Sequence, residues 1–121
     1  KRNHIAPYVF IGSRDPVTIE DYVAIGASSK IYSNSQVVIA NKRMSGPMIP
    51  EEDKAFHSAP VYLRKDSFLG ANVVVLPGVE IGEGAVVAAN SLVIMSVSHS
   101  TVVMRSPARR FMKREKIKDT Y

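Results

Sequence analysis

The 121-residue sequence contains no cysteine and no tryptophan. The absence of cysteine excludes a disulfide framework, a thiolate zinc site and a cysteine nucleophile, and it disfavours redox chemistry. No charged and then apolar leader follows Lys1, so no signal peptide is visible. The uncharged stretch over residues 85–104 is interrupted by Asn90, His99 and several hydroxyl residues, so no membrane-spanning helix is expected. The length predicts a single domain, which we expect to be cytoplasmic.

Positive charge is concentrated near the end of the chain. The net charge is +5, and seven of the sixteen Lys and Arg residues fall between Arg105 and Lys118. Such a segment is either a solvated tail or a phosphate-binding edge, and its composition leaves both open. Nucleic acid is disfavoured as a partner, because the five Tyr and four Phe are scattered rather than interleaved with the basic cluster.

A six-residue repeat runs through most of the sequence. From Leu63 onward every sixth residue is a large aliphatic: Leu63, Leu69, Val75, Ile81, Val87 and Val93. Two places before each stands a small or β-branched residue: Val61, Ser67, Val73, Val79, Ala85 and Ser91. The same period appears earlier, with a two-residue insertion at the turn 13–16, in Ile5, Ile11, Ile19, Ile25, Ile31 and Val37.

A period of six predicts very short strands separated by tight turns. Three strands would close one triangular coil, and stacked coils would bring the repeated aliphatic residues into inward ladders. Gly12, Gly26, Gly70 and Gly82 directly follow ladder residues, where a turn needs either positive φ or close backbone approach.

The repeat also predicts how the single domain is organised. We expect coils over 1–39 and 61–104, a protruding loop over 40–60, and a basic C-terminal segment over 105–121. Good helix formers after Pro107 predict a short helix over residues 108–118 that caps the column.

Three segments carry a family resemblance: LGAN at 69–72, LPGVEIGEGAVVAANSLV at 76–93 and SPAR at 106–109. They resemble the hexapeptide-repeat acyltransferases, particularly the maltose, galactoside and surface-polysaccharide sugar O-acetyltransferases. The resemblance implies an all-β, left-handed parallel β-helix, and the hand comes from the resemblance alone. It also implies a homotrimer that binds acetyl-CoA between subunits and acetylates a sugar hydroxyl in polysaccharide biosynthesis.

Apolar residues at positions expected to face outward support association independently. Val38, Val74, Val86 and Leu92 would lie on the lateral faces of a thin column, which one subunit cannot cover. Association is therefore expected, and the resemblance implies that the assembly is a homotrimer.

The resemblance also implies a donor site. The family holds the pantetheine arm with backbone groups at positions matching Ala71 and Ala89. It holds the nucleotide phosphates with basic side chains, which this sequence supplies as Arg105, Arg109, Lys113 and Arg114. The sequence departs from the family at Asn90 and Arg105, where glycine is usual; either side chain would narrow the groove, and Arg105 could instead reach a phosphate.

The acceptor hydroxyl needs a base, for which histidine suits neutral pH. The galactoside and maltose enzymes carry theirs early in the loop, where this sequence has residues 33–36, Ser-Asn-Ser-Gln. Of the three histidines, His57 near the returning end of the loop is the candidate base, whereas His4 and His99 are expected to be structural. Asn34 can position a hydroxyl but cannot take its proton.

Two other functions remain open at this point. A catalytically degenerate homologue would serve as a trimeric scaffold or bind CoA without turnover, as the missing early-loop histidine suggests. A gamma-type carbonic anhydrase shares the expected architecture but needs three histidines around zinc, and His4, His57 and His99 are far apart in sequence. No metal is expected.

Overall fold

The structure is a computed structural model that describes residues 2–36 and 56–114, with the backbone alone for residues 35, 36, 56 and 57. These two ranges are built of short β-strands and contain no helix that could cross a membrane. The strands are β1 (His4–Ile5), β2 (Phe10–Gly12), β3 (Val17–Ile19), β4 (Ala24–Ile25), β5 (Lys30–Tyr32), β6 (Asn34–Gln36), β7 (Phe56–Ser58), β8 (Val61–Leu63), β9 (Phe68–Leu69), β10 (Val74–Val75), β11 (Glu80–Ile81), β12 (Val86–Val87), β13 (Leu92–Val93), β14 (Thr101–Met104) and β15 (Arg109–Lys113).

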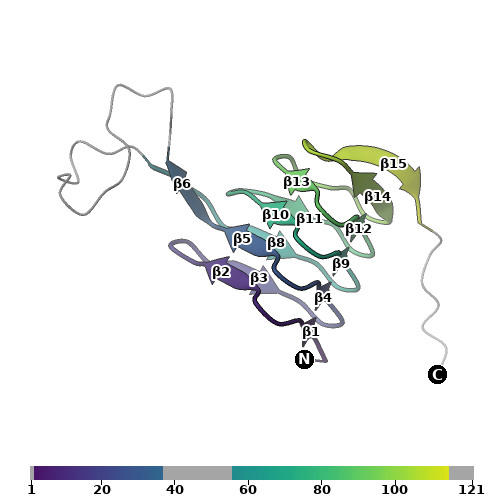
Figure 1. Cartoon of the computed structure of the whole chain (residues 1–121), viewed down its shortest axis with the longest axis horizontal. Helices are drawn as coiled ribbons and strands as arrows, with labels where there is room; N and C mark the ends of the chain where they lie inside the picture. The colour runs from purple at the N-terminus through teal and green to yellow at the C-terminus, as the bar shows by residue number, and fades with distance from the viewer. Residues whose placement is uncertain (1, 37–55, 115–121) are drawn as a thin grey trace.

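Three sheets form the walls of a column, and the chain visits them in rotation (Figure 1). Sheet A has the order β1-β4-β9-β12-β14-β15, sheet B has β13-β10-β5-β2, and sheet C has β11-β8-β3. Pairing between coils is parallel, and Leu69 pairs with Val87 just as Leu63 pairs with Ile81. These partners are one coil of three six-residue units apart, so the structure confirms the parallel β-helix that the repeat predicts.

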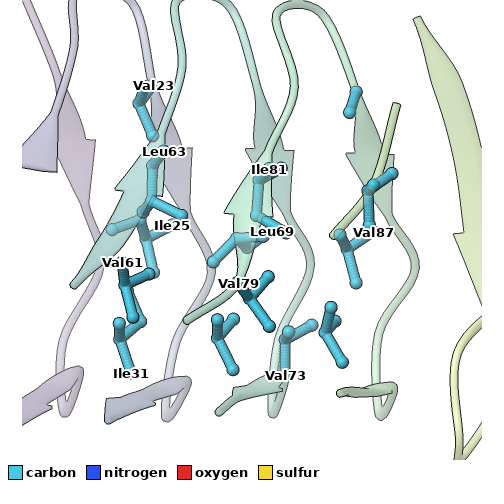
Figure 2. Packing of buried hydrophobic residues seen from close by; sticks show 14 of the residues in the cluster. Val23, Ile25, Ile31, Val61, Leu63, Leu69, Val73, Val79, Ile81 and Val87 are labelled. Carbon is cyan, nitrogen blue, oxygen red and sulfur yellow. The ribbon is translucent and has the colours of Figure 1, made fainter. Parts of the chain in front are cut away.

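The interior of the column is a stack of aliphatic side chains (Figure 2). All six ladder residues from Leu63 to Val93 have no exposed surface, and the residues two places before them are also buried. Burial decreases at the first coil, where Ile5 is 47% exposed and Ile11 and Ile19 are half-buried. The hydrophobic stabilisation therefore resides mainly in the coils from β4 onward.

Close backbone approach explains three of the four glycines that follow ladder residues. A Cβ at Gly26 would lie 2.5 Å from the Gly70 carbonyl carbon, and one at Gly70 would lie 2.7 Å from the Ala89 nitrogen. At Gly82 the distance to the His99 nitrogen would be 2.6 Å. Positive φ instead occurs two residues later, for example at Asn72, where φ is 56°. Glycine is thus needed where successive coils touch.

The short C-terminal helix expected over residues 108–118 is not observed in the described part of that segment. Arg109–Lys113 form β15, which pairs antiparallel with β14. The reason is the free edge of β14, whose backbone groups gain partners from a returning strand and would lack them beneath a helix. Residues 115–118 of the expected helix lie outside the described ranges.

Candidate active site

The column has three corners, each made of turns stacked along its length. The A–B corner contains turns 26–28, 70–72 and 88–90; the B–C corner contains turns 13–16 and 76–78; the C–A corner contains turns 20–22, 64–66, 82–84 and 98–100. Between turns 13–16 and 76–78 the chain leaves the B–C corner at Ser33 and returns at Ala59. The Ala59 amide donates a 2.9 Å hydrogen bond to the Ser33 carbonyl, which ties the two ends of this insertion together.

A two-stranded sheet forms the base of the insertion. β6 pairs antiparallel with β7, with Asn34 opposite Ser58 and Ser35 opposite His57. The half-buried Asn34 and the backbone of His57 therefore come from neighbouring strands, although 23 residues separate them in sequence. The predicted loop residues 40–55 and Val38 lie outside the described residues.

A hydroxyl and carboxylate network fastens this base to the preceding coil. Ser58 Oγ donates to Asp15 Oδ2 at 2.7 Å, and the Asp15 amide donates to Ser33 Oγ at 2.9 Å. Ser33 Oγ in turn donates to the Gly12 carbonyl at 3.1 Å, and Ser33 is fully buried. Neither Asp15 nor Ser58 was predicted from the sequence to belong to the site. The only signal for Asp15 was its place in an irregular turn of the repeat.

The A–B corner brings together three of the residues assigned to donor binding. The Asn90 amide donates to the Ala71 carbonyl at 2.9 Å, so the turns that contain Ala71 and Ala89 are stacked directly. Arg105 follows on the next coil, where its carbonyl accepts a 3.2 Å hydrogen bond from the Leu92 amide. Asn90 and Arg105 have φ of 64° and 87°, so both occupy the left-handed conformation that a glycine would adopt without strain.

The other three basic residues are divided between two corners. Arg109 lies opposite Met104 on β15, near the A–B corner, and is exposed. Lys113 Nζ donates to the His99 carbonyl at 3.0 Å, and Arg114 donates to the Asp66 and Gly84 carbonyls at 3.2 and 3.1 Å. The latter two side chains thus bind backbone carbonyls around the C–A corner.

The C–A corner also contains an ion-pair network that sequence reasoning missed. Arg64 contacts Glu80 through Nε at 2.6 Å and Glu20 at 2.9 Å, and its guanidinium carbon lies 4.5 Å from the Tyr62 ring centroid. The hydrogen bond from Arg64, followed by one from the Lys65 amide, lowers the pKa of Glu20 below its ordinary value. The ladder register could have revealed the network, because it stacks the strands that precede Arg64 and Glu20.

A depression of about 510 Å³ lies beside these charges and is lined by Glu20, Arg64, Glu80, Glu83 and His99 among others. His4 lies in β1, where its amide donates a hydrogen bond to the Val23 carbonyl. Among the residues that the structure describes, no three His, Asp or Glu side chains are grouped so that they could hold a metal ion.

Comparisons with known proteins point to one family. Residues 60–94 match the family described as bacterial transferase hexapeptide (six repeats). The chain is 36% identical over 113 residues to the dTDP-4-amino-4,6-dideoxy-D-glucose acyltransferase of Escherichia coli, a match that covers 93% of this chain. It is 34% identical over 114 residues, 82% of its length, to WbbJ of E. coli K12, which is assigned to O-acetyl transfer in lipopolysaccharide biosynthesis.

The fold is shared with a solved structure. It is AntD, an N-acyltransferase from Bacillus cereus, in a variant in which one serine is replaced by cysteine. That structure, in complex with dTDP-4-amino-4,6-dideoxyglucose and coenzyme A, superposes on this chain with a TM-score of 0.89. The match has 29% identity and covers 94% of this chain and 61% of AntD. The architecture is therefore the left-handed parallel β-helix of the acyltransferases. The chain spans 58% of the length of the two E. coli relatives.

Proposed function

Because the chain belongs to the hexapeptide-repeat transferase family, we propose that it transfers an acyl group, in the first instance acetyl, from acyl-CoA to a sugar hydroxyl. The observation that carries this proposal is the pairing of β6 with β7 at the B–C corner. These neighbouring strands carry His57, the candidate general base, and Asn34, the candidate positioning residue. The relatives named for acyl transfer in sugar and lipopolysaccharide chemistry support it. The setting would be surface-polysaccharide biosynthesis in the cytoplasm.

His57 acts as the general base in this proposal. It takes the proton from the acceptor hydroxyl while the oxygen attacks the thioester carbonyl, and a backbone N–H stabilises the oxyanion. Collapse of the tetrahedral intermediate breaks the carbon–sulfur bond, and the CoA thiolate leaves and takes up a proton. Asn34 accepts or donates a hydrogen bond that orients the hydroxyl, since an amide does both but cannot act as a base.

The donor would lie along the A–B corner. Backbone groups at Ala71 and Ala89 bind the pantetheine arm, and Arg105 and Arg109 bind the phosphates through charge-assisted hydrogen bonds. Lys113 and Arg114, which the sequence assigned to the same role, bind carbonyls of the C–A corner, and these contacts favour a role in fastening β15.

A homotrimer would complete the site. The A–B and B–C corners lie at opposite ends of the strands of sheet B, so the donor corner of one copy would meet the insertion base of the next. An outward apolar ladder on sheet A supports association, since Phe68 pairs with Val86 and Val86 with Val102, and Phe68 is 42% exposed.

N-acylation of an amino sugar is the second candidate. Two relatives are named for a 4-amino-4,6-dideoxy sugar or found bound to it. The Asp15 carboxylate beside β7 adds a specific observation, because a carboxylate would bind the ammonium form of an amino sugar, which then gives one proton to His57 so that the neutral amine can attack. The two candidates differ only in the acceptor atom, so they share the donor site.

The test is acyl transfer from acetyl-CoA to matched sugars that carry either a hydroxyl or an amine at the reacting carbon. His57→Ala is expected to lower turnover about a hundredfold or more on the hydroxyl sugar without changing CoA affinity. His99→Ala is the control and should behave as wild type. If His57→Ala retains the wild-type rate, His57 is not the base.

A mixing experiment tests whether the site is shared between copies. At CoA concentrations below saturation, trimers formed from His57→Ala and Arg109→Ala chains together should be more active than either variant alone, because some of their shared sites then carry neither substitution. Without recovery, the site belongs to one chain. A wild-type protein that binds CoA but acylates no sugar would instead be the degenerate, CoA-binding homologue.

A further inference from the structure

An aromatic pair lies on the outer face of sheet B, where Phe10 is exposed and Tyr32 is half-buried. Phe10 of β2 and Tyr32 of β5 have ring centroids 5.6 Å apart with an interplanar angle of 46°. Their strand neighbours Ile11 and Ile31 pair with each other and point inward, so both rings stand on the outside. Phe10 is 52% exposed, which is costly for a phenylalanine that the column does not need for its core.

Gly12 leaves room for the two rings. A Cβ at Gly12 would lie 3.0 Å from Phe10 Cε2 and 3.4 Å from Tyr32 Cδ1, and no backbone atom is among its nearest contacts. Gly12 is also absent from the residues with positive φ. Neither coil contact nor backbone conformation therefore requires glycine here, unlike at Gly26 or Gly70. The missing side chain serves the arrangement of the rings.

The pair adjoins the insertion base. Tyr32 precedes Asn34 by two residues, and the Gly12 carbonyl accepts the hydrogen bond from Ser33 Oγ. Figure 1 shows β2 and β5 side by side, with β6 leading directly away from β5. A molecule that reaches Asn34 along sheet B would therefore pass over these rings.

We infer that Phe10, Gly12 and Tyr32 form a platform that binds the pyranose ring of the acceptor, an inference whose acceptor identity rests on the proposed function. Two aromatic rings inclined at 46° to each other cannot both stack flat against a planar nucleobase. They form an open angle that suits a saturated, non-planar ring, whose C–H groups contact one aromatic face and the other ring's edge. The platform would thus select and orient the sugar before transfer.

The experiment measures sugar binding directly, with dTDP-4-amino-4,6-dideoxyglucose and, separately, dTDP as probes. Saturation-transfer NMR on the full chain should show contact at the pyranose C–H protons. Phe10→Ala and Gly12→Ala should each weaken sugar-nucleotide binding at least fivefold and leave CoA affinity unchanged. Tyr32→Ala, which removes the second ring, should weaken sugar-nucleotide binding to a similar extent. Tyr22→Ala removes a 45% exposed ring at the C–A corner and is the matched control.

Each outcome separates the platform from the proposed function. Wild-type binding by both Phe10→Ala and Gly12→Ala overturns the platform while sugar acylation can still stand. If the variants lose affinity for dTDP and for the sugar nucleotide equally, the platform is also overturned, because the rings would then bind the thymine base and not the sugar. Ring-dependent sugar binding by a protein that transfers no acyl group supports the platform and contradicts the proposed function. The absence of sugar binding in wild type refutes the platform.

Discussion

Ser58 donates a 2.7 Å hydrogen bond to the carboxylate of Asp15, and this bond links the returning strand of the insertion to the coil before it. The two residues are 43 positions apart in sequence. Because Ser58 directly follows His57 on β7, the same bond fixes the strand that carries the proposed base.

We expect Ser58→Ala to reduce turnover severalfold, because loss of the hydroxyl lets β7 move relative to Asn34 while the donor corner is unaffected. Steady-state kinetics with CoA titration will measure this. Ser58→Thr keeps the hydroxyl and should restore most of the rate, and Ser13→Ala, which removes a different hydrogen bond to residue 15, should change little. A fully active Ser58→Ala would show that the bond has no part in positioning β7.

Gly70→Ala should destabilise the protein by about 1–3 kcal/mol, since its Cβ would meet the Ala89 backbone, which cannot move without separating two coils. Chemical denaturation will measure the free energy of unfolding. Gly12→Ala is the matched control, because its Cβ meets only side-chain atoms. Equal stability of the two variants would refute close coil contact as the reason for Gly70.

The Glu20–Arg64 ion pair should make the thermal stability of the protein depend on pH in the acidic range. The pKa of Glu20 is lowered in the folded protein from an ordinary value of 4.5, so its contribution is present above about pH 4.5 and is lost as the pH falls through the lowered pKa. The melting temperature of wild type should therefore exceed that of Glu20→Gln at pH 7, and the difference should vanish in strong acid. A difference that is unchanged at low pH would contradict this assignment.

Arg109 and Arg114 are only five positions apart in sequence. Arg109 should nevertheless contribute to CoA binding, and Arg114 to thermal stability. Arg109→Ala should weaken CoA binding about tenfold, with a smaller dependence on salt, if the side chain contacts phosphate. Arg114→Ala should instead lower thermal stability, because the Asp66 and Gly84 carbonyls lose a donor. Calorimetric titration and melting curves on both variants separate the two roles, and weakened CoA binding in Arg114→Ala would return that residue to the donor site.

The repeat predicted the column because its period is local and strict: each residue from Leu63 to Val93 in the ladder is buried as expected. The C-terminal strand was not predictable in this way. Residues 109–113 have helical propensity, but the unpaired edge of β14 decided their conformation, and that edge exists only after folding.

The candidate site was predictable from the sequence only where its residues follow the repeat. Ala71 and Ala89 follow the repeat and are therefore stacked in one corner. Arg105 reaches the same corner through a shorter last coil, in which Val103 pairs with Val87. Asp15 and Ser58 meet only because the insertion closes on itself, a contact that no periodicity encodes. Likewise, Arg64 joins Glu20 to Glu80 across coils, which becomes evident only once the register is known.

The hydrogen bond between the Ala59 amide and the Ser33 carbonyl has an evolutionary consequence. Since the column continues in register on both sides of this closure, the enclosed segment can be lengthened, shortened or exchanged while the ladder stays intact. Closing a loop of twice the length costs only about 0.6 kcal/mol more in chain entropy. Under the proposed function, descendants of such a chain could therefore acquire new acceptor preferences by rewriting one segment, while folding and donor recognition are inherited unchanged.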